Sequence, residues 1–133
     1  MNRFTLIAAL AITVAFAGCG EPDRGLKEVT GSVKYNDGRV PAGEIAVVTF
    51  TPDSGDYQIK GASGDIKPDG TFQLTTSKPG DGAFQGKYKV VLQVFKTYAD
   101  RELAVDERYT RLNSTPFEAE VGPENNHFDF VLE

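Results

Sequence analysis

Apolar residues recur at every second position in several short runs, and this period constrains the fold more than any other feature of the chain. In residues 29–35 the apolar members are Val29, Gly31, Val33 and Tyr35, and polar residues stand between them. Successive side chains of a strand point to opposite faces of its sheet. A period of two therefore predicts strands that are buried on one face.

Turn-forming residues separate these runs. Asn36-Asp37-Gly38 and Pro68-Asp69-Gly70 each follow or precede an alternating stretch, and glycine supplies the positive φ that tight turns need. Residues 44–51 are apolar on both faces, as in a central strand. The sequence predicts about seven strands, over residues 29–35, 44–51, 57–66, 71–76, 87–95, 117–121 and 127–133.

Strands with one apolar face must bury that face against another layer. We therefore expect an all-β fold of two stacked sheets, an antiparallel Greek-key sandwich of the immunoglobulin-like kind. The predicted core contains Val33, Val47, Phe72, Leu74, Tyr88, Val90, Leu92, Phe128, Phe130 and Leu132.

The first residues predict an export signal in front of this domain. Arg3 is followed by an apolar run from Leu6 to Ala17, which is too short for a comfortable membrane span of about 20 residues. The junction Phe16-Ala17-Gly18-Cys19 resembles the lipobox of bacterial lipoproteins. The resemblance implies a signal peptide over residues 1–18, a lipid on Cys19, a short linker over 19–27 and the β domain over 28–133.

The cysteine count agrees with this interpretation. Cys19 is the only cysteine, so no intramolecular disulfide can form, and lipidation explains an odd cysteine in an exported chain. The alternative is an ordinary cleaved signal with an incidental cysteine. Gly20 stands where an aspartate often retains lipoproteins at the inner membrane. We therefore expect a lipid-anchored envelope protein, on the periplasmic or outer-membrane side, with the outer membrane favoured.

Several motifs, taken in order, resemble those of small bacterial lipoproteins with a carboxypeptidase-regulatory-like, transthyretin-like domain. They cover residues 31–35 (GSVKY), 68–74 (PDGTFQL), 78–83 (KPGDGA), 86–91 (GKYKVV) and 126–132 (NHFDFVL). The resemblance implies a transthyretin-like β-sandwich, an exported location and a structural, adhesive or binding role.

Composition excludes several function classes. The net charge of −5 becomes −6 once Arg3 is removed, and no basic cluster is present, which argues against nucleic-acid partners. His127 is the only histidine and is expected on the outward face of the last strand. One histidine and one lipidated cysteine cannot build a Ser-His-Asp triad or a multi-histidine zinc site, so we predict no enzyme and no cofactor.

Two acidic features remain as alternatives. Calcium binds 6–8 oxygen ligands, and the loops Asp53–Asp56, Asp65–Asp69 and Gly80–Gly82 place carboxylates among Gly and Pro. Asp-Gly is equally what turns require, so we predict no strong calcium site. Glu102, Asp106 and Glu107 are interpreted as a solvated helix face.

The stretch from Thr97 to Thr115 is long for a connection in so small a fold. It contains the residue types that are enriched in interface hot spots, and Arg101, Arg108 and Tyr109 are the candidate contact residues. The alternative is a packed crossover with Leu103, Val105 and Leu112 turned inward. Separately, the charged residues 100–109 are compatible with one or two helical turns.

These expectations together predict a non-enzymatic module for structural, adhesive or protein- or glycan-binding roles in the envelope. The alternative is an envelope protein that binds a small ligand or calcium.

Overall fold

The computed structural model describes residues 25–53 and 59–133. The predicted signal peptide, Cys19 and most of the linker lie outside the described residues. The described elements are β1 (Leu26–Lys27), β2 (Thr30–Tyr35), β3 (Ile45–Pro52), β4 (Ala62–Asp65), β5 (Thr71–Gln73), β6 (Ala83–Phe84), β7 (Gly86–Phe95), the 3₁₀ helix η1 (Glu107–Thr110), β8 (Glu118–Val121) and β9 (His127–Leu132).

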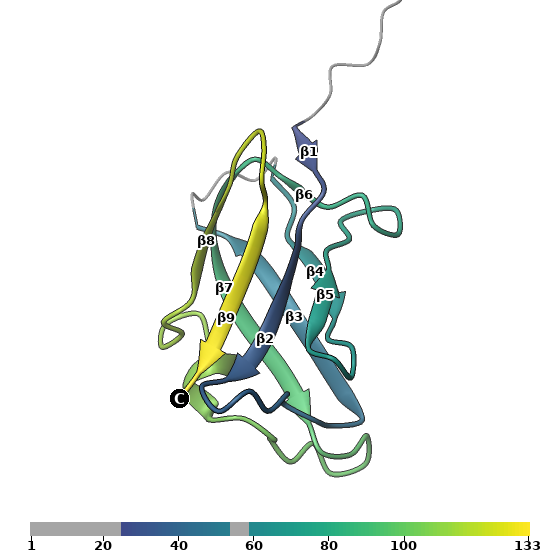
Figure 1. The fold of residues 1–133 in the computed structure, drawn as a ribbon, viewed down its shortest axis with the longest axis vertical. Coiled ribbons are helices and arrows are strands. Elements are labelled where there is room, and N and C mark those ends of the chain that lie inside the picture. The colour runs from purple at the N-terminus through teal and green to yellow at the C-terminus, as the bar shows by residue number, and fades with distance from the viewer. Residues whose placement is uncertain (1–24, 54–58) are drawn as a thin grey trace, which may run out of the picture.

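The strands form an all-β fold with two principal sheets (Figure 1). One sheet has the order β5-β2-β9, and the other has the order β4-β3-β7-β8. A third pairing joins the short β1 to β6. The principal strands are the seven that the alternating runs predict, but their pairing is not purely antiparallel. β2 and β9 run parallel, with Thr30 opposite His127 and Tyr35 opposite Leu132, because both strands start from the end of the domain where β1 lies.

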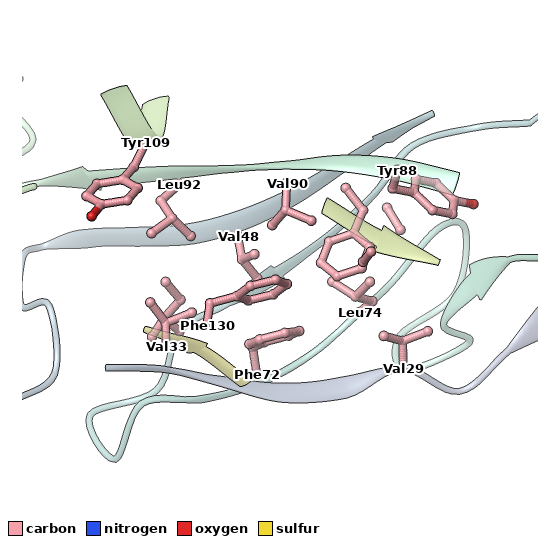
Figure 2. Close-up of a cluster of buried hydrophobic side chains, with 14 of the residues drawn as sticks. Val29, Val33, Val48, Phe72, Leu74, Tyr88, Val90, Leu92, Tyr109 and Phe130 are labelled. Carbon is pink, nitrogen blue, oxygen red and sulfur yellow. The ribbon is translucent and has the colours of Figure 1, made fainter. Parts of the chain in front are cut away.

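The inner faces of the two sheets share one hydrophobic core (Figure 2). Phe50 of β3 lies at its centre, and its ring centroid is 6.3 Å from that of Phe72, 5.8 Å from Tyr88 and 6.0 Å from Phe130. Tilted and edge-to-face pairs of this kind each contribute about 0.5–1.5 kcal/mol beyond the area they bury. Aromatic contacts therefore join the two sheets.

The predicted core is confirmed at all but one position. The buried members are Val33, Phe72, Leu74, Tyr88, Val90, Leu92, Phe130 and Leu132, and Phe128 is partly buried against them. The prediction that Val47 is a core residue is wrong. Val47 is only partly buried, while Val48 and Phe50 are the buried residues of β3. This run is apolar on both faces, so its pattern does not define which face turns inward.

The two edges of this double layer are closed differently. At one edge, backbone hydrogen bonds of 3.0 and 2.8 Å join Ser63 of β4 to Thr75 after β5. A Cβ atom on Gly64 would lie 2.3 Å from the Gln73 carbonyl oxygen, so only glycine permits this approach. At the other edge, side chains close the gap, with the Phe117 ring 5.1 Å from Phe130.

The two ends of the domain differ in what they carry. β1 lies at one end, and η1, the connection that precedes it and the C-terminus lie at the other (Figure 1). Within residues 25–53 and 59–133, no helix is long and apolar enough to cross a membrane.

Candidate functional site

The long connection after β7 begins as a hairpin. Backbone hydrogen bonds of 2.8 Å run from Lys96 N–H to the Glu102 carbonyl and from Ala104 N–H to the Val94 carbonyl. The Lys96 ammonium also lies 2.6 Å from the Glu102 carboxylate. The chain therefore continues β7 outward, turns, and returns beside itself. We call the turning residues, Thr97–Arg101, the tip.

Side chains hold the tip in one shape. The Thr97 hydroxyl donates to the Asp100 carboxylate at 2.5 Å, and the Glu102 N–H donates to the same oxygen at 3.1 Å. These donors lower the pKa of Asp100 below its ordinary value, with the Thr97 hydroxyl as the largest cause. Glu44, the residue directly before β3, accepts the Tyr98 N–H with its carboxylate at 2.7 Å. The tip is thus fixed both by hydrogen bonds among its own residues and by the contact with Glu44.

The tip presents two large side chains to solvent. Tyr98 is 69 % exposed, the largest exposed fraction among the large hydrophobic side chains of the described residues. Arg101 is also exposed, and its backbone adopts a φ of +52°. Non-glycine residues with positive φ are uncommon and persist where the surrounding structure holds them. The hydrogen bonds around Asp100 supply that restraint.

The second half of the connection is built into the core. Asp106 caps η1 by accepting the Arg108 N–H at 2.9 Å. Tyr109 is only 2 % exposed, and its ring stacks on Phe117 at 5.2 Å (Figure 2 shows it hanging from η1 into the core). Its hydroxyl accepts hydrogen bonds from the Arg108 guanidinium at 2.5 Å and from the Glu133 N–H at 3.1 Å.

The candidate contact residues therefore fall into two groups. Arg108 lies over the Tyr109 ring, with its guanidinium carbon 4.6 Å from the centroid. Arg101 lies on the tip, and Tyr109 is a core residue rather than a free contact. The predicted packed crossover holds in part: Val105 is buried and Leu103 is partly buried, but Leu112 is 45 % exposed. Tyr98 was not among the predicted contact residues, although it lies in the same stretch. It is the aromatic side chain that the tip exposes.

The acidic residues of this connection do not converge. Glu102 pairs with Lys96, Asp106 caps η1, and Glu107 pairs with Arg111. In the part of the chain that the structure describes, no three His, Cys, Asp or Glu side chains form a group suited to a metal ion.

Two carboxylates of the loops considered for calcium, those of Asp81 and Asp69, bind groups of their own loops. The Asp81 carboxylate accepts N–H groups of Thr76, Ser77 and Lys78 at 2.7, 3.0 and 2.8 Å. Burial raises the pKa of Asp81, but these three donors outweigh it, and the pKa lies below its ordinary value. Asp69 likewise accepts the N–H and hydroxyl of Thr71. Asp53 is exposed, and residues 54–56 lie outside the described residues.

His127 lies on the outer face of the three-stranded sheet, as the alternation predicts. Its Nε2 is 3.0 Å from the Asp129 carboxylate, and its Nδ1 is 3.0 Å from the Thr30 hydroxyl. The Ser32 hydroxyl donates to Asp129 at 2.6 Å rather than to the imidazole. Ser32 therefore does not contact the imidazole, whereas Thr30, His127 and Asp129 stand in the order of hydroxyl, base and orienting carboxylate. These contacts are exposed on the outer face of the sheet.

Comparison with protein-family models, with curated proteins and with solved structures found no match.

Proposed function

We propose that this chain is a non-enzymatic envelope module, anchored by a lipid on Cys19, which binds a protein partner through Tyr98 and Arg101 of the tip. We further propose that its two facing sheets form a Greek-key, transthyretin-like sandwich. The observation that carries the proposal is the placement of a restrained, exposed tip at the end of the domain opposite β1.

The anchor and the tip are complementary in position. The residues from Cys19 to Arg24 precede the described fold, and six residues span at most roughly 20 Å when fully extended. A lipid on Cys19 therefore keeps the β1 end close to the membrane. The opposite end, with the tip, is then the end that other envelope proteins reach.

The chemistry of the tip suits a protein surface with an acidic group. Tyr and Arg are enriched in hot spots because they combine a large contact area with a polar end. The acidic neighbours are already engaged: Glu102 binds Lys96, and Asp100 binds Thr97 and the Glu102 N–H. Arg101 makes no ion pair with another described residue, so its guanidinium is available to a carboxylate of the partner.

The restraint of the tip also favours binding. A loop that is already fixed loses little conformational entropy when it meets a partner. The paired arms and the bonds around Asp100 place Tyr98 and Arg101 before any contact is made.

The anchor is tested by mass spectrometry of the mature N-terminus. We expect a chain that begins at an acylated Cys19, and Cys19→Ala should release the protein from membranes. An unmodified Cys19, or unchanged membrane attachment of the variant, would contradict the anchoring part of the proposal.

The partner contact is tested by crosslinking in the native membrane. The double variant Tyr98→Ala with Arg101→Ala should lose the crosslinked partner and keep its melting temperature. The matched control is Arg111→Ala with Leu112→Ala, which removes an exposed arginine and an exposed apolar residue from the same connection. Equal capture by the tip variant, the control and the natural chain would refute the tip as the contact.

A further inference from the structure

A hollow lies at the edge of the domain where β4 approaches β5. Its volume is about 380 Å³, and its polar lining comes from Ser63 and Asp65 of β4, Lys67, Gln73 of β5, and Thr75 and Gly80 after it. Figure 1 shows β4, β5 and the loop that follows β5 grouped along one side of the molecule. Ligand sites commonly have volumes of about 300–1,000 Å³.

Most of the lining side chains are unengaged. The side chains of Ser63, Asp65, Lys67 and Gln73 make no hydrogen bond or ion pair with other described residues, whereas Thr75 accepts the Gly80 N–H at 3.0 Å. Elsewhere on the surface, carboxylates such as Asp37, Asp69 and Asp81 are each bonded within the fold. The hollow therefore gathers at one place several donors and acceptors that no other described residue binds through a hydrogen bond or ion pair.

The backbone around the hollow is fixed before any ligand arrives. The paired hydrogen bonds between Ser63 and Thr75 hold its floor, and Gly64 permits the close approach. The three N–H donors to Asp81 hold the neighbouring loop, in which Gly80 has a φ of +73°. A preformed site reduces the entropy lost on binding.

The charge of the lining selects the chemistry of the ligand. The opposite charges of Asp65 and Lys67 leave the lining without net charge, which favours a ligand that carries no net charge. Gln73 both donates and accepts, as do the hydroxyls of Ser63 and Thr75. A ligand that matches this set carries several groups that both donate and accept hydrogen bonds.

We infer that the hollow binds one neutral, polyhydroxylated sugar unit. Sugar hydroxyls both donate and accept, and the volume accommodates one ring. No aromatic side chain lines the hollow, so no stacking surface adds to the hydrogen bonds and the affinity is weak, with a Kd in the range of about 1 mM or above. The site is separate from the tip and does not depend on the proposed partner.

The test is an NMR titration of the ¹⁵N-labelled mature chain, residues 19–133, with N-acetylglucosamine and with glucose. We expect saturable shifts confined to the amides of Gly64, Gln73, Thr75 and Gly80. Glycerol at the same hydroxyl concentration serves as the control for a general solvent effect. Shifts that are absent, that spread over the whole domain, or that glycerol reproduces would overturn the inference.

Variants assign the binding to the hollow. Gln73→Ala should weaken binding by about tenfold, the equivalent of one lost hydrogen bond. Gln93→Ala is the matched control, because Gln93 is an exposed glutamine on the outer face of the other sheet, and it should change nothing. Equal weakening by both variants would refute the site. The trimer of N-acetylglucosamine identifies the source: tighter binding than the monosaccharide indicates a glycan chain, and equal binding indicates a free sugar.

Discussion

The tip and η1 belong to the same connection and use the same residue types, yet they have opposite structural roles. Each carries a tyrosine and an arginine, but Tyr98 is 69 % exposed and Tyr109 is 2 % exposed. The tip turns through hydrogen bonds among its own polar residues. η1 instead inserts Tyr109 against Phe117 and uses the tyrosine hydroxyl to hold Arg108 and the C-terminal strand end.

This difference shows that residue type alone does not identify a contact surface. Tyr and Arg occur in hot spots, and they also occur in cores where the hydroxyl and guanidinium find internal partners. What separates the two cases is whether the polar end of the side chain is already satisfied. Four substitutions or conditions test the comparison.

Tyr109→Ala should have the largest effect. Truncation of a buried aromatic side chain typically costs about 3–5 kcal/mol, because it removes buried area and leaves a cavity. Tyr98→Ala should change the free energy of unfolding by about 0.5 kcal/mol or less, since its side chain is in solvent. Chemical denaturation of both variants measures the difference. Similar losses of stability would show that the exposed and buried roles are wrongly assigned.

The fold could be predicted well wherever the alternation was strict. Phe128, Phe130 and Leu132 point inward as the period of two requires. The alternation did not identify the inward face of β3, because both of its faces carry apolar residues. The sequence therefore did not show whether Val47 or Val48 is buried. The parallel pairing of β2 with β9 also lay beyond the pattern, since alternation specifies the faces of a strand but not its neighbours.

The candidate site was predicted less well. The length of the connection and its Tyr and Arg content indicated the right segment, but not which member was free. Tyr109 is buried because Phe117, which follows it by eight residues, supplies a stacking partner across the open sheet edge. Tyr98 is exposed on a tip whose backbone is held by Glu44, a residue distant in sequence. Both contacts are tertiary, and the local sequence does not specify them.

Asp106→Ala should have the next largest effect. The Asp106 carboxylate accepts the Arg108 N–H at the start of η1, and loss of such a cap costs about 0.5–2 kcal/mol. Asp106→Ser keeps an acceptor oxygen and should recover most of that loss. Denaturation midpoints of the two variants measure this. An alanine variant as stable as the serine variant would mean that η1 is held by Tyr109 alone.

Acid should open the tip. The pKa of Asp100 is lowered in the fold, first by the Thr97 hydroxyl and then by the Glu102 N–H. The contribution of these bonds is therefore fully present above the unfolded pKa and is lost as the pH falls through the folded pKa. Amide spectra between pH 6 and pH 2 should show the tip signals moving together.

The control for this acid response is Asp100→Asn, which carries no titrating group. Its tip amides should show no such step. A step that survives in the variant would assign the acid response to another group.

Arg101→Gly should change the free energy of unfolding least, and the sign of that change is informative. Arg101 holds a φ of +52°, which glycine adopts without the steric cost that a Cβ atom brings. Glycine also raises the conformational entropy of the unfolded chain. This offsets the removal of the steric cost by about 0.4–1 kcal/mol. The net change should be a stabilisation of a few tenths of a kcal/mol, whereas Arg101→Ala keeps the strained backbone and should gain nothing.

Both variants lack the guanidinium, so both should lose partner capture to the same degree while differing in denaturation midpoint. If alanine proved the more stable of the two, the tip would not hold its positive φ in solution, and the claim that it is restrained before binding would fall with it.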